Sequence, residues 1–322
     1  MGKKADMIAA LAGRTPASAV PIWELEFQAW DATSGKHVVL GHEFEALSQP
    51  EQEKAMHANA EILLAVASDM EYSGLTVPNG YWNHAPGQLA YYCMPGDTRF
   101  RQTAILRELA PPDLMLIACA GGIIGADYSP EFCYRLVDDP ESVDAQARDC
   151  LRYALETAKR FRDCGVEAVV SPSDIADNSG PFFNPEQMRR WILPYLTQWS
   201  QAIREMGMFT ILHTDGNLTR YMDAIAATGL DAIQAIDPVA GMDMRKTMDI
   251  VGQRLCLCGN IDCGLLVRGR PEEVYDVTRL LLTECKAGGR LILGASNAVQ
   301  PDVPMDNYRA MIHAWREFGR YD

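Results

Sequence analysis

The strongest constraint on the fold is an alternation of apolar runs with helix-length segments that continues along the chain. Eight apolar runs have the length and composition of strands, and they occupy residues 19–27, 75–77, 114–119, 167–171, 209–213, 231–236, 254–258 and 290–294. Segments with apolar residues at helical spacing, such as 51–70 and 140–164, separate nearly all of them. Such alternation selects a parallel sheet, and eight strands without an evident edge strand favour a closed (β/α)₈ barrel, the TIM barrel.

An open, doubly wound α/β sheet is the alternative to the barrel. Its dinucleotide-binding version carries a GxGxxG motif after the first strand, and no such motif follows residues 19–27. No linker-like run of Pro, Gly and Ser divides the chain. We therefore expect one domain over residues 1–322, with a helical extension at the N-terminus and loop insertions at the C-terminal face of the barrel.

Charge and cysteine usage exclude several classes of function. The 43 acidic and 29 basic residues give a formal net charge of −14, which argues against binding nucleic acid through its phosphates. No run reaches the roughly 18 apolar residues of a membrane-spanning helix. The nine cysteines form no pair of CxxC units, so neither a disulfide framework nor a zinc finger is indicated. A reduced, cytoplasmic setting is the expectation.

Polar side chains follow the expected strands, at the end of a barrel where active sites lie. These residues are Glu24, Glu26, Asn79, Tyr81, Gly121, Gly122, Asp174, Asp177, His213, Asp215, Asp237, Asn260, Asp262, Ser296 and Asn297. Acids gathered at one mouth require a cation, a proton or hydrogen-bond donors nearby, because a single buried charge is costly to desolvate. An acid between a strand and a helix is also an ordinary helix N-cap, and we assign that role to Asp139, Asp262 and Asp302.

The apolar run 209–213 ends on His213, and Asp215 follows two positions later. Residues at i and i+2 of an extended segment point to the same side, so both side chains could reach one metal ion or one substrate proton. Cys258 is the one cysteine placed where a strand reaches the mouth. It is a candidate ligand, with a small buried hydrophobe as the alternative.

Six short motifs occur between residue 113 and the C-terminus in a recognisable order. They are residues 173–181, 193–196, 213–217, 240–243, 258–262 and 300–304. On these motifs the chain resembles the uroporphyrinogen decarboxylase superfamily, which includes the decarboxylase itself and cobalamin-dependent methyltransferases. The resemblance implies a (β/α)₈ barrel, in agreement with the strand count.

The chain departs from the decarboxylase branch of that superfamily. Those enzymes carry an arginine-rich segment after the first strand, where arginines pair with the carboxylates of the tetrapyrrole. Here the matching segment 23–30 contains Glu24 and Glu26 and no arginine, so a polyanion would be repelled. Asn297 also stands where the decarboxylases have a histidine.

The thiol-methylating branch uses zinc held by a His-x-Cys pair and a second cysteine. His213 matches the histidine of that pattern, whereas Asp215 and Asn297 replace the two cysteines. Zinc held by a histidine nitrogen and carboxylate oxygens is better suited to act as a Lewis acid than to activate a thiol as thiolate. This pattern favours a third group, the corrinoid-protein methyltransferases that begin the O-demethylation of methoxylated aromatics.

The resemblance therefore predicts a methyltransferase that moves a methyl group from a small methoxylated donor to a separate corrinoid protein. We expect His213, Asp215 and Asp174 to be catalytic, and zinc to be held by His213, Asp215 and Cys258. Substrate contacts are expected from Glu24, Glu26, Tyr81, Trp82, Asp177, Asp237 and Asn297. The aromatic residues near strand ends fit an aromatic donor, or else pack loops onto the barrel.

Two other functions stay open at this stage. One is a metal-free decarboxylase that acts on a smaller acid, with Asp174 or Asp215 handling the proton. The other is a non-catalytic relative that binds a tetrapyrrole. The sequence leaves a homodimer open as well.

Overall fold

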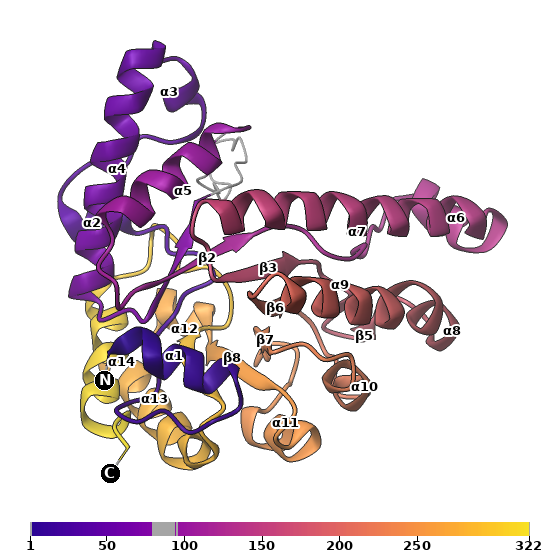
Figure 1. Cartoon of the computed structure of the whole chain (residues 1–322). Helices are drawn as coiled ribbons and strands as arrows, with labels where there is room; N and C mark the ends of the chain where they lie inside the picture. Colours follow the sequence, from indigo (N-terminus) through magenta and orange to yellow (C-terminus); the bar gives the residue numbers. More distant parts are fainter. Residues whose placement is uncertain (1, 79–93, 95, 322) are drawn as a thin grey trace.

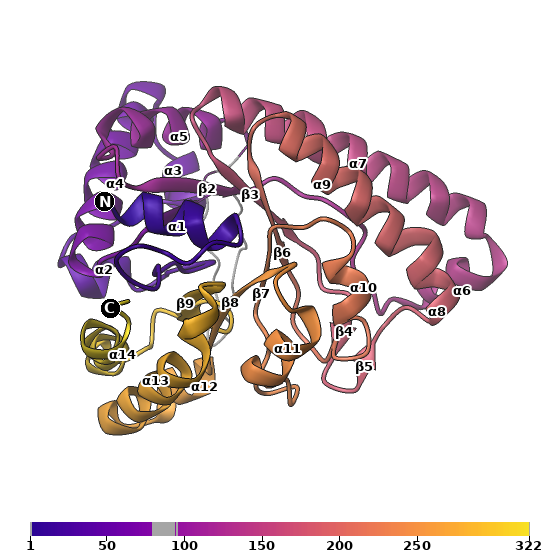
Figure 2. The same cartoon turned by 60° about the horizontal axis from the view of Figure 1, so that its bottom comes forward.

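A computed structural model describes residues 2–78, 94 and 96–321 of the chain. Its central sheet has seven strands, all parallel, in the order β1-β2-β3-β6-β7-β8-β9. The strands are β1 (Gly74–Val77), β2 (Met115–Cys119), β3 (Ala168–Pro172), β6 (Phe209–His213), β7 (Ala232–Gln234), β8 (Cys256–Ile261) and β9 (Leu291–Ala295). The sheet curls strongly, and the outer helices surround it (Figure 2).

The segment 19–27 occupies the remaining position, between β9 and β1. Trp23 donates its backbone N–H to the carbonyl of Leu293 at 3.0 Å, and Ser73 donates to the carbonyl of Ile22 at 2.8 Å. The segment thus closes the barrel, but our prediction of a regular strand there is wrong, because it pairs only through isolated bridges. Pro21 has no N–H to donate, which interrupts the ladder. The chain is a TIM barrel as predicted.

Helices cover the outside of the barrel and one of its ends (Figure 1). They are α1 (Lys3–Leu11), α2 (Trp30–Ser34), α3 (Gly41–Glu45), α4 (Gln49–Asp69), α5 (Thr98–Leu109), α6 (Pro130–Asp138), α7 (Pro140–Asp163), α8 (Pro185–Gln187), α9 (Leu193–Glu205), α10 (Met222–Ala226), α11 (Met244–Val251), α12 (Cys263–Arg268), α13 (Pro271–Cys285) and α14 (Met305–Phe318). A short hairpin of β4 (Ala176–Asp177) and β5 (Gly180–Pro181) follows β3.

Helix α1 closes the N-terminal end of the barrel. Lys4 donates its backbone N–H to Asp113, just before β2, and its ammonium pairs with Glu167, just before β3. Met7 and Leu11 are buried in the same apolar cluster as the inward side chains of the strands. The polar C-terminal ends of the strands consequently lie at the opposite end, which α1 leaves uncovered.

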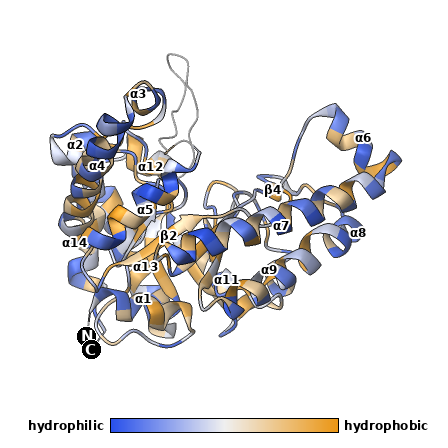
Figure 3. Cartoon of the chain, turned by 45° about the horizontal axis from the view of Figure 1, so that its top comes forward, coloured by the Kyte–Doolittle hydropathy of each residue, from blue (hydrophilic) through white to orange (hydrophobic). Residues whose placement is uncertain are grey.

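Two apolar layers hold the barrel together. The interior layer includes Ile117, Val170 and Ile211, and the outer layer lies between the strands and the helices, where Trp191 and Trp199 are almost fully buried. Each such side chain contributes about 1.5–3 kcal/mol relative to exposure. Hydrophobic residues accordingly gather on the strands and the inner helix faces (Figure 3). No helix among the described residues is long and apolar enough to cross a membrane.

The helix predicted over 140–164 is confirmed as α7. Asp139 caps it by accepting a hydrogen bond from the N–H of Ser142 at 3.3 Å, and Gly165 follows its end with a φ of 87°. The predicted cap at Asp262 is also confirmed, because its Oδ1 accepts from Gly264 N–H at 2.6 Å. The predicted cap at Asp302 is wrong, because α14 begins only after Pro304.

The segment 185–205 forms an interrupted helix. The chain forms α8, then a π-helical turn at Met188–Ile192, and then α9. Pro194, the second residue of α9, cannot donate a backbone hydrogen bond to the preceding turn, and the wider turn accommodates that loss.

Candidate functional site

The candidate site begins at the C-terminal end of β6, where the buried strand passes into a polar turn. His213 is the last residue of β6 and is 7% exposed. The turn depends on Gly216, which has a φ of 87°. A Cβ at Gly216 would lie 2.6 Å from the carbonyl carbon of Ala176, so a side chain there is excluded. The turn therefore packs closely against the segment that carries Asp174.

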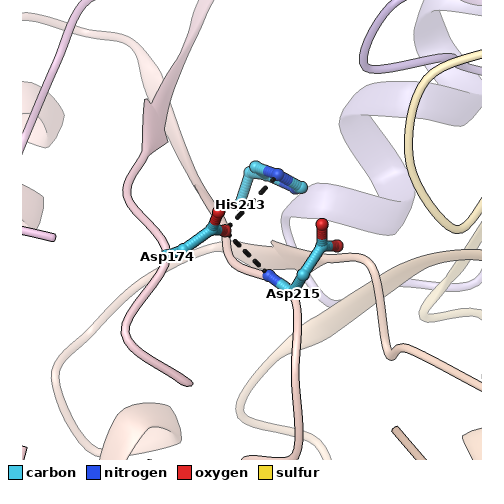
Figure 4. Close-up of side chains that lie close together, drawn as sticks. All are labelled: Asp174, His213 and Asp215. Atoms are coloured by element: carbon cyan, nitrogen blue, oxygen red, sulfur yellow. Dashed lines mark hydrogen bonds and ion pairs between the residues drawn. The ribbon is translucent and has the colours of Figure 1, made fainter. Parts of the chain in front are cut away.

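Asp174, His213 and Asp215 form a compact cluster (Figure 4). Oδ1 of Asp174 accepts a hydrogen bond from the backbone N–H of Asp215 at 3.0 Å and lies 3.8 Å from Nε2 of His213. One ligand atom from each residue lies within 4.8 Å of the other two. Across the described ranges, no other group of three His, Cys, Asp or Glu residues meets this spacing.

Gln234, at the end of β7, fixes the orientation of the His213 ring. Its Nε2 donates to the carbonyls of Ala295 and Ser296 at 3.1 and 3.2 Å, so its Oε1 must be the atom that faces His213. That oxygen lies 2.5 Å from Nδ1 of His213 and can only accept. His213 therefore carries a proton on Nδ1, and in the neutral ring Nε2 keeps its lone pair for a metal or a substrate proton.

The carboxylate of Asp215 is held in an unfavourable environment for a charge. Burial raises its pKa to about 6, and the negative charges of Asp174 and Asp237 add to that increase. The His213 ring and the hydrogen bond from Asn297 lower the pKa and oppose the increase. Nδ2 of Asn297 donates to Oδ2 of Asp215, which leaves Oδ1 of Asp215 available. A cation or a proton at this place would relieve the repulsion among the acids.

Asp237 stabilises the turn after β6 through hydrogen bonds to the backbone. Its Oδ2 accepts from the N–H of Gly216 at 3.2 Å, and its Oδ1 accepts from the N–H of Val239 at 2.9 Å. The chain reaches Asp237 through Ile236, which has a φ of 45° that is rare for a β-branched residue. The predicted strand 231–236 thus ends early, at Gln234, because this backbone leaves the sheet.

A polar cavity of about 380 Å³ opens beside Asp215. Its lining residues are Gln28, Asp215, Asp237, Val239, Asp262, Cys263, Gly264, Arg268, Ser296, Asn297, Ala298 and Gln300. The predicted residues Asp215, Asp237 and Asn297 therefore share one cavity. Its volume falls within the range of small-molecule sites.

Glu24 and Glu26, both predicted to contact the substrate, are absent from this lining. Burial raises the pKa of Glu24 to about 8, and its carboxyl accepts hydrogen bonds from Ala295 N–H and the Tyr308 hydroxyl, which oppose the shift. Burial likewise raises the pKa of Glu26 to about 7, against a hydrogen bond from Gln28. The placement of Glu24 is that of a structural group in the barrel wall.

The other predicted site residues lie in different places. Asp177 is in the β4–β5 hairpin and accepts from the hydroxyl of Tyr128 at 3.2 Å. Cys258 is fully buried in the apolar barrel interior, outside the cluster of Asp174, His213 and Asp215, and burial raises the pKa of its thiol. This placement favours the small buried hydrophobe, the alternative to a ligand. Tyr81 and Trp82 lie outside the described residues.

Sequence reasoning missed Gln234, Cys263 and Arg268. Gln234 could have been recognised as a polar amide within an apolar strand, because a buried amide requires a hydrogen-bond partner. No sequence signal pointed to Cys263 and Arg268, because they reach the cavity from α12, a helix that the sequence pattern did not reveal.

Comparisons with known proteins agree with the fold. The model of the family described as Uroporphyrinogen decarboxylase (URO-D) matches residues 103–318, more than half of the chain. A methylated-thiol–coenzyme M methyltransferase of Methanosarcina mazei is 29% identical over 187 residues, which are 57% of this chain and 47% of that protein. A uroporphyrinogen decarboxylase of Chlorobium phaeovibrioides is 26% identical over 156 residues, which are 47% of this chain and 43% of that protein.

The matched segments thus span less than half the length of these curated relatives. Among solved structures, a methyltransferase from Methanosarcina mazei matches with a TM-score of 0.70 and 17% identity, over 99% of both chains. That likeness supports the fold. By the family match, which includes the site at the end of β6, this chain belongs to the uroporphyrinogen decarboxylase (URO-D) family.

Proposed function

We propose that this chain is a methyltransferase that moves a methyl group from a small methoxylated donor to the cobalt of a separate corrinoid protein. Family membership supports the proposal, since relatives include the methylated-thiol–coenzyme M methyltransferase and a methylcobamide:CoM methyltransferase of Methanosarcina acetivorans, 26% identical over 145 residues. The observation that carries it is the cluster of Asp174, His213 and Asp215 at the mouth of the barrel.

The cluster fits a zinc ion by the chemistry of its donor atoms. It offers one imidazole nitrogen and carboxylate oxygens from two residues, all of which zinc accepts. Two carboxylates at this spacing repel each other, and a divalent cation would turn that repulsion into attraction. Zinc bound by these residues would supply Lewis acidity, which polarises the ether oxygen of the donor and makes its methyl group more electrophilic.

The remaining residues of the site orient these groups. Gln234 holds the proton on Nδ1 of His213, which directs Nε2 toward Asp174. Asn297 holds Oδ2 of Asp215 and so fixes the direction of Oδ1. The cavity beside Asp215 offers space for a small donor next to the cluster.

A decarboxylase that acts on a smaller acid is the second candidate. It is favoured by the pKa of Asp215, which burial raises to about 6, close to the value that suits a group transferring protons near neutral pH. Relatives in the family also include uroporphyrinogen decarboxylases. This function would use Asp215 or Asp174 without a metal.

Metal analysis and a methylation assay distinguish the two functions. We expect about one zinc per chain, and methylation of cob(I)alamin by at least one member of a panel of methyl ethers. His213→Ala should remove both properties, whereas His57→Ala, on α4 and outside the cluster, should leave both unchanged.

A metal-free protein that transfers no methyl group would contradict the proposal. Release of carbon dioxide from a small acid that stops in Asp215→Asn would then support the decarboxylase. Retention of a corrinoid or porphyrin without turnover would instead point to a non-catalytic binding protein.

A further inference from the structure

We propose that Arg268 binds a carboxylate group of the methyl donor, so that the donors are methyl ethers of small carboxylic acids. This inference rests on the proposed function and narrows its substrate class. Arg268 is the last residue of α12 and lines the same cavity as Asp215 and Asn297. In the described lining of that cavity it is the only lysine or arginine.

The backbone of α12 directs the Arg268 side chain along the cavity wall. A Cβ at Gly264 would lie 2.4 Å from Nη2 of Arg268, so the guanidinium rests against the bare backbone at the start of the helix. A larger residue at position 264 would displace it. Gly264 therefore leaves room for the guanidinium beside Asp262, at the first turn of α12.

The Arg268 guanidinium has no partner among the residues that the structure describes. No hydrogen bond or ion pair joins the Arg268 side chain to any residue that the structure describes. An arginine offers five N–H donors, and a ligand in the cavity could receive them.

The acids of the cavity, by contrast, already have donors. Asp262 accepts from two backbone amides at the start of α12, and Asp237 accepts from two amides after β6 and β7. Asp215 accepts from Asn297 and belongs to the proposed metal cluster. Arg268 is exposed, so water solvates its donors in the free protein, and it is the one cation in the described lining that an anionic ligand could reach by displacing that water.

A planar guanidinium binds a carboxylate through two parallel hydrogen bonds, a geometry that a point charge does not reproduce. A donor with a carboxylate at one end and a methoxy group at the other would contact Arg268 while presenting its ether oxygen to the cluster of Asp174, His213 and Asp215. Neutral methyl donors have no carboxylate and would not make the contact with Arg268.

Binding to the full chain, without any corrinoid, tests the inference. The probes are matched pairs, 4-methoxybenzoate with 4-methoxybenzamide and methoxyacetate with methoxyacetamide, measured by calorimetry. We expect the wild type to bind the acid about tenfold more tightly than the amide in at least one pair. Arg268→Gln should bring the two affinities within about twofold of each other, and Arg268→Lys should fall between, because it keeps the charge and loses the planar fork.

Arg279→Gln is the matched control, since Arg279 is exposed on α13 beside Asp276 and lies outside the cavity lining. It should keep the preference for the acid. Equal affinity for acid and amide in the wild type, an equal loss of both in Arg268→Gln, or no binding of any probe would overturn the inference.

A loss of methyl transfer to a corrinoid protein in Arg268→Gln, with an unchanged preference for the acid, would also overturn it, because Arg268 would then serve the partner protein. A preserved acid preference without any methyl transfer in the wild type would overturn only the proposed function.

Discussion

Two groups of acids in this molecule have raised pKa values, and they differ in what surrounds them. At the mouth of the barrel, burial raises the pKa of Asp215 to about 6, and Asp174 and Asp237 increase it further. In the barrel wall, burial raises the pKa of Glu24 to about 8. Glu24 lies between the N–H of Ala295 and the hydroxyl of Tyr308.

The difference lies in which atoms remain unused. The wall acid is enclosed by donors, and Tyr308 in turn contacts the hydroxyl of Tyr72 at 2.8 Å. Asp215 borders a cavity, and its Oδ1 has no hydrogen-bond partner among the described residues. A raised pKa thus marks burial in both places, whereas unused ligand atoms mark a binding site in only one.

Asp215→Ala should give the largest effect, and it should act on metal binding alone. Removal of one of three ligands should weaken zinc binding by about a thousandfold or more. The free energy of unfolding of the metal-free protein should change by less than about 1 kcal/mol, because the variant also removes a charge that is costly to bury. Competition with a chromophoric chelator and urea denaturation measure the two quantities.

The exposed acid Asp276, which pairs with Arg279 on α13, provides the control for this change. Asp276→Ala should keep the zinc affinity of the wild type. An unchanged zinc affinity in Asp215→Ala would remove Asp215 from the ligand set.

Glu24→Ala should show the reverse pattern. It leaves the Ala295 N–H and the Tyr308 hydroxyl without a partner and opens a cavity in the wall, so the free energy of unfolding should fall by about 3 kcal/mol. Zinc affinity should stay within about twofold of the wild type, because Glu24 has no contact with the cluster. A variant with normal stability and weakened zinc binding would show that the two groups of acids are not separate.

Gln234→Met tests the orientation of His213 without removing a ligand. The variant leaves Nδ1 of His213 without its acceptor, so the ring loses its fixed proton position and direction. Loss of such a supporting hydrogen bond typically weakens metal binding by about 10- to 100-fold. Zinc affinity measured by chelator competition should fall in that range. An affinity equal to that of the wild type would contradict the role assigned to Gln234.

The sequence predicted the barrel and the central pair of the site for a physical reason. Alternating apolar runs and helices have few compact solutions, and in a barrel the residues after the strands meet at one end. His213 and Asp215 could therefore be expected together, and Asp174 with them. They lie at or just after the ends of the neighbouring parallel strands β3 and β6, which brings them within ligand distance of one another.

Prediction from the sequence failed for residues whose position along the chain does not determine where the side chain points. Glu24 and Glu26 lie near the end of the apolar run 19–27, but both are outside the described lining of the cavity, and Glu24 accepts a hydrogen bond from Tyr308 in the wall. Arg268 enters the cavity only because α12 is short and Gly264 lacks a side chain. Such contacts depend on tertiary packing, which hydrophobic periodicity does not encode.

The smallest expected effect is the pH dependence contributed by Glu24. Its pKa rises from 4.5 to about 8 on folding, so between these values the folded chain keeps a proton that the unfolded chain releases. The stability contributed by this proton is complete below pH 4.5 and is lost as the pH rises through about 8. Between pH 6.5 and 7.5 the free energy of unfolding should therefore fall by about 1 kcal/mol more in the wild type than in Glu24→Gln. Glu26 and Asp215 titrate in both proteins, so their contributions cancel in the difference, and equal slopes in urea denaturation would contradict the assignment of a protonated Glu24.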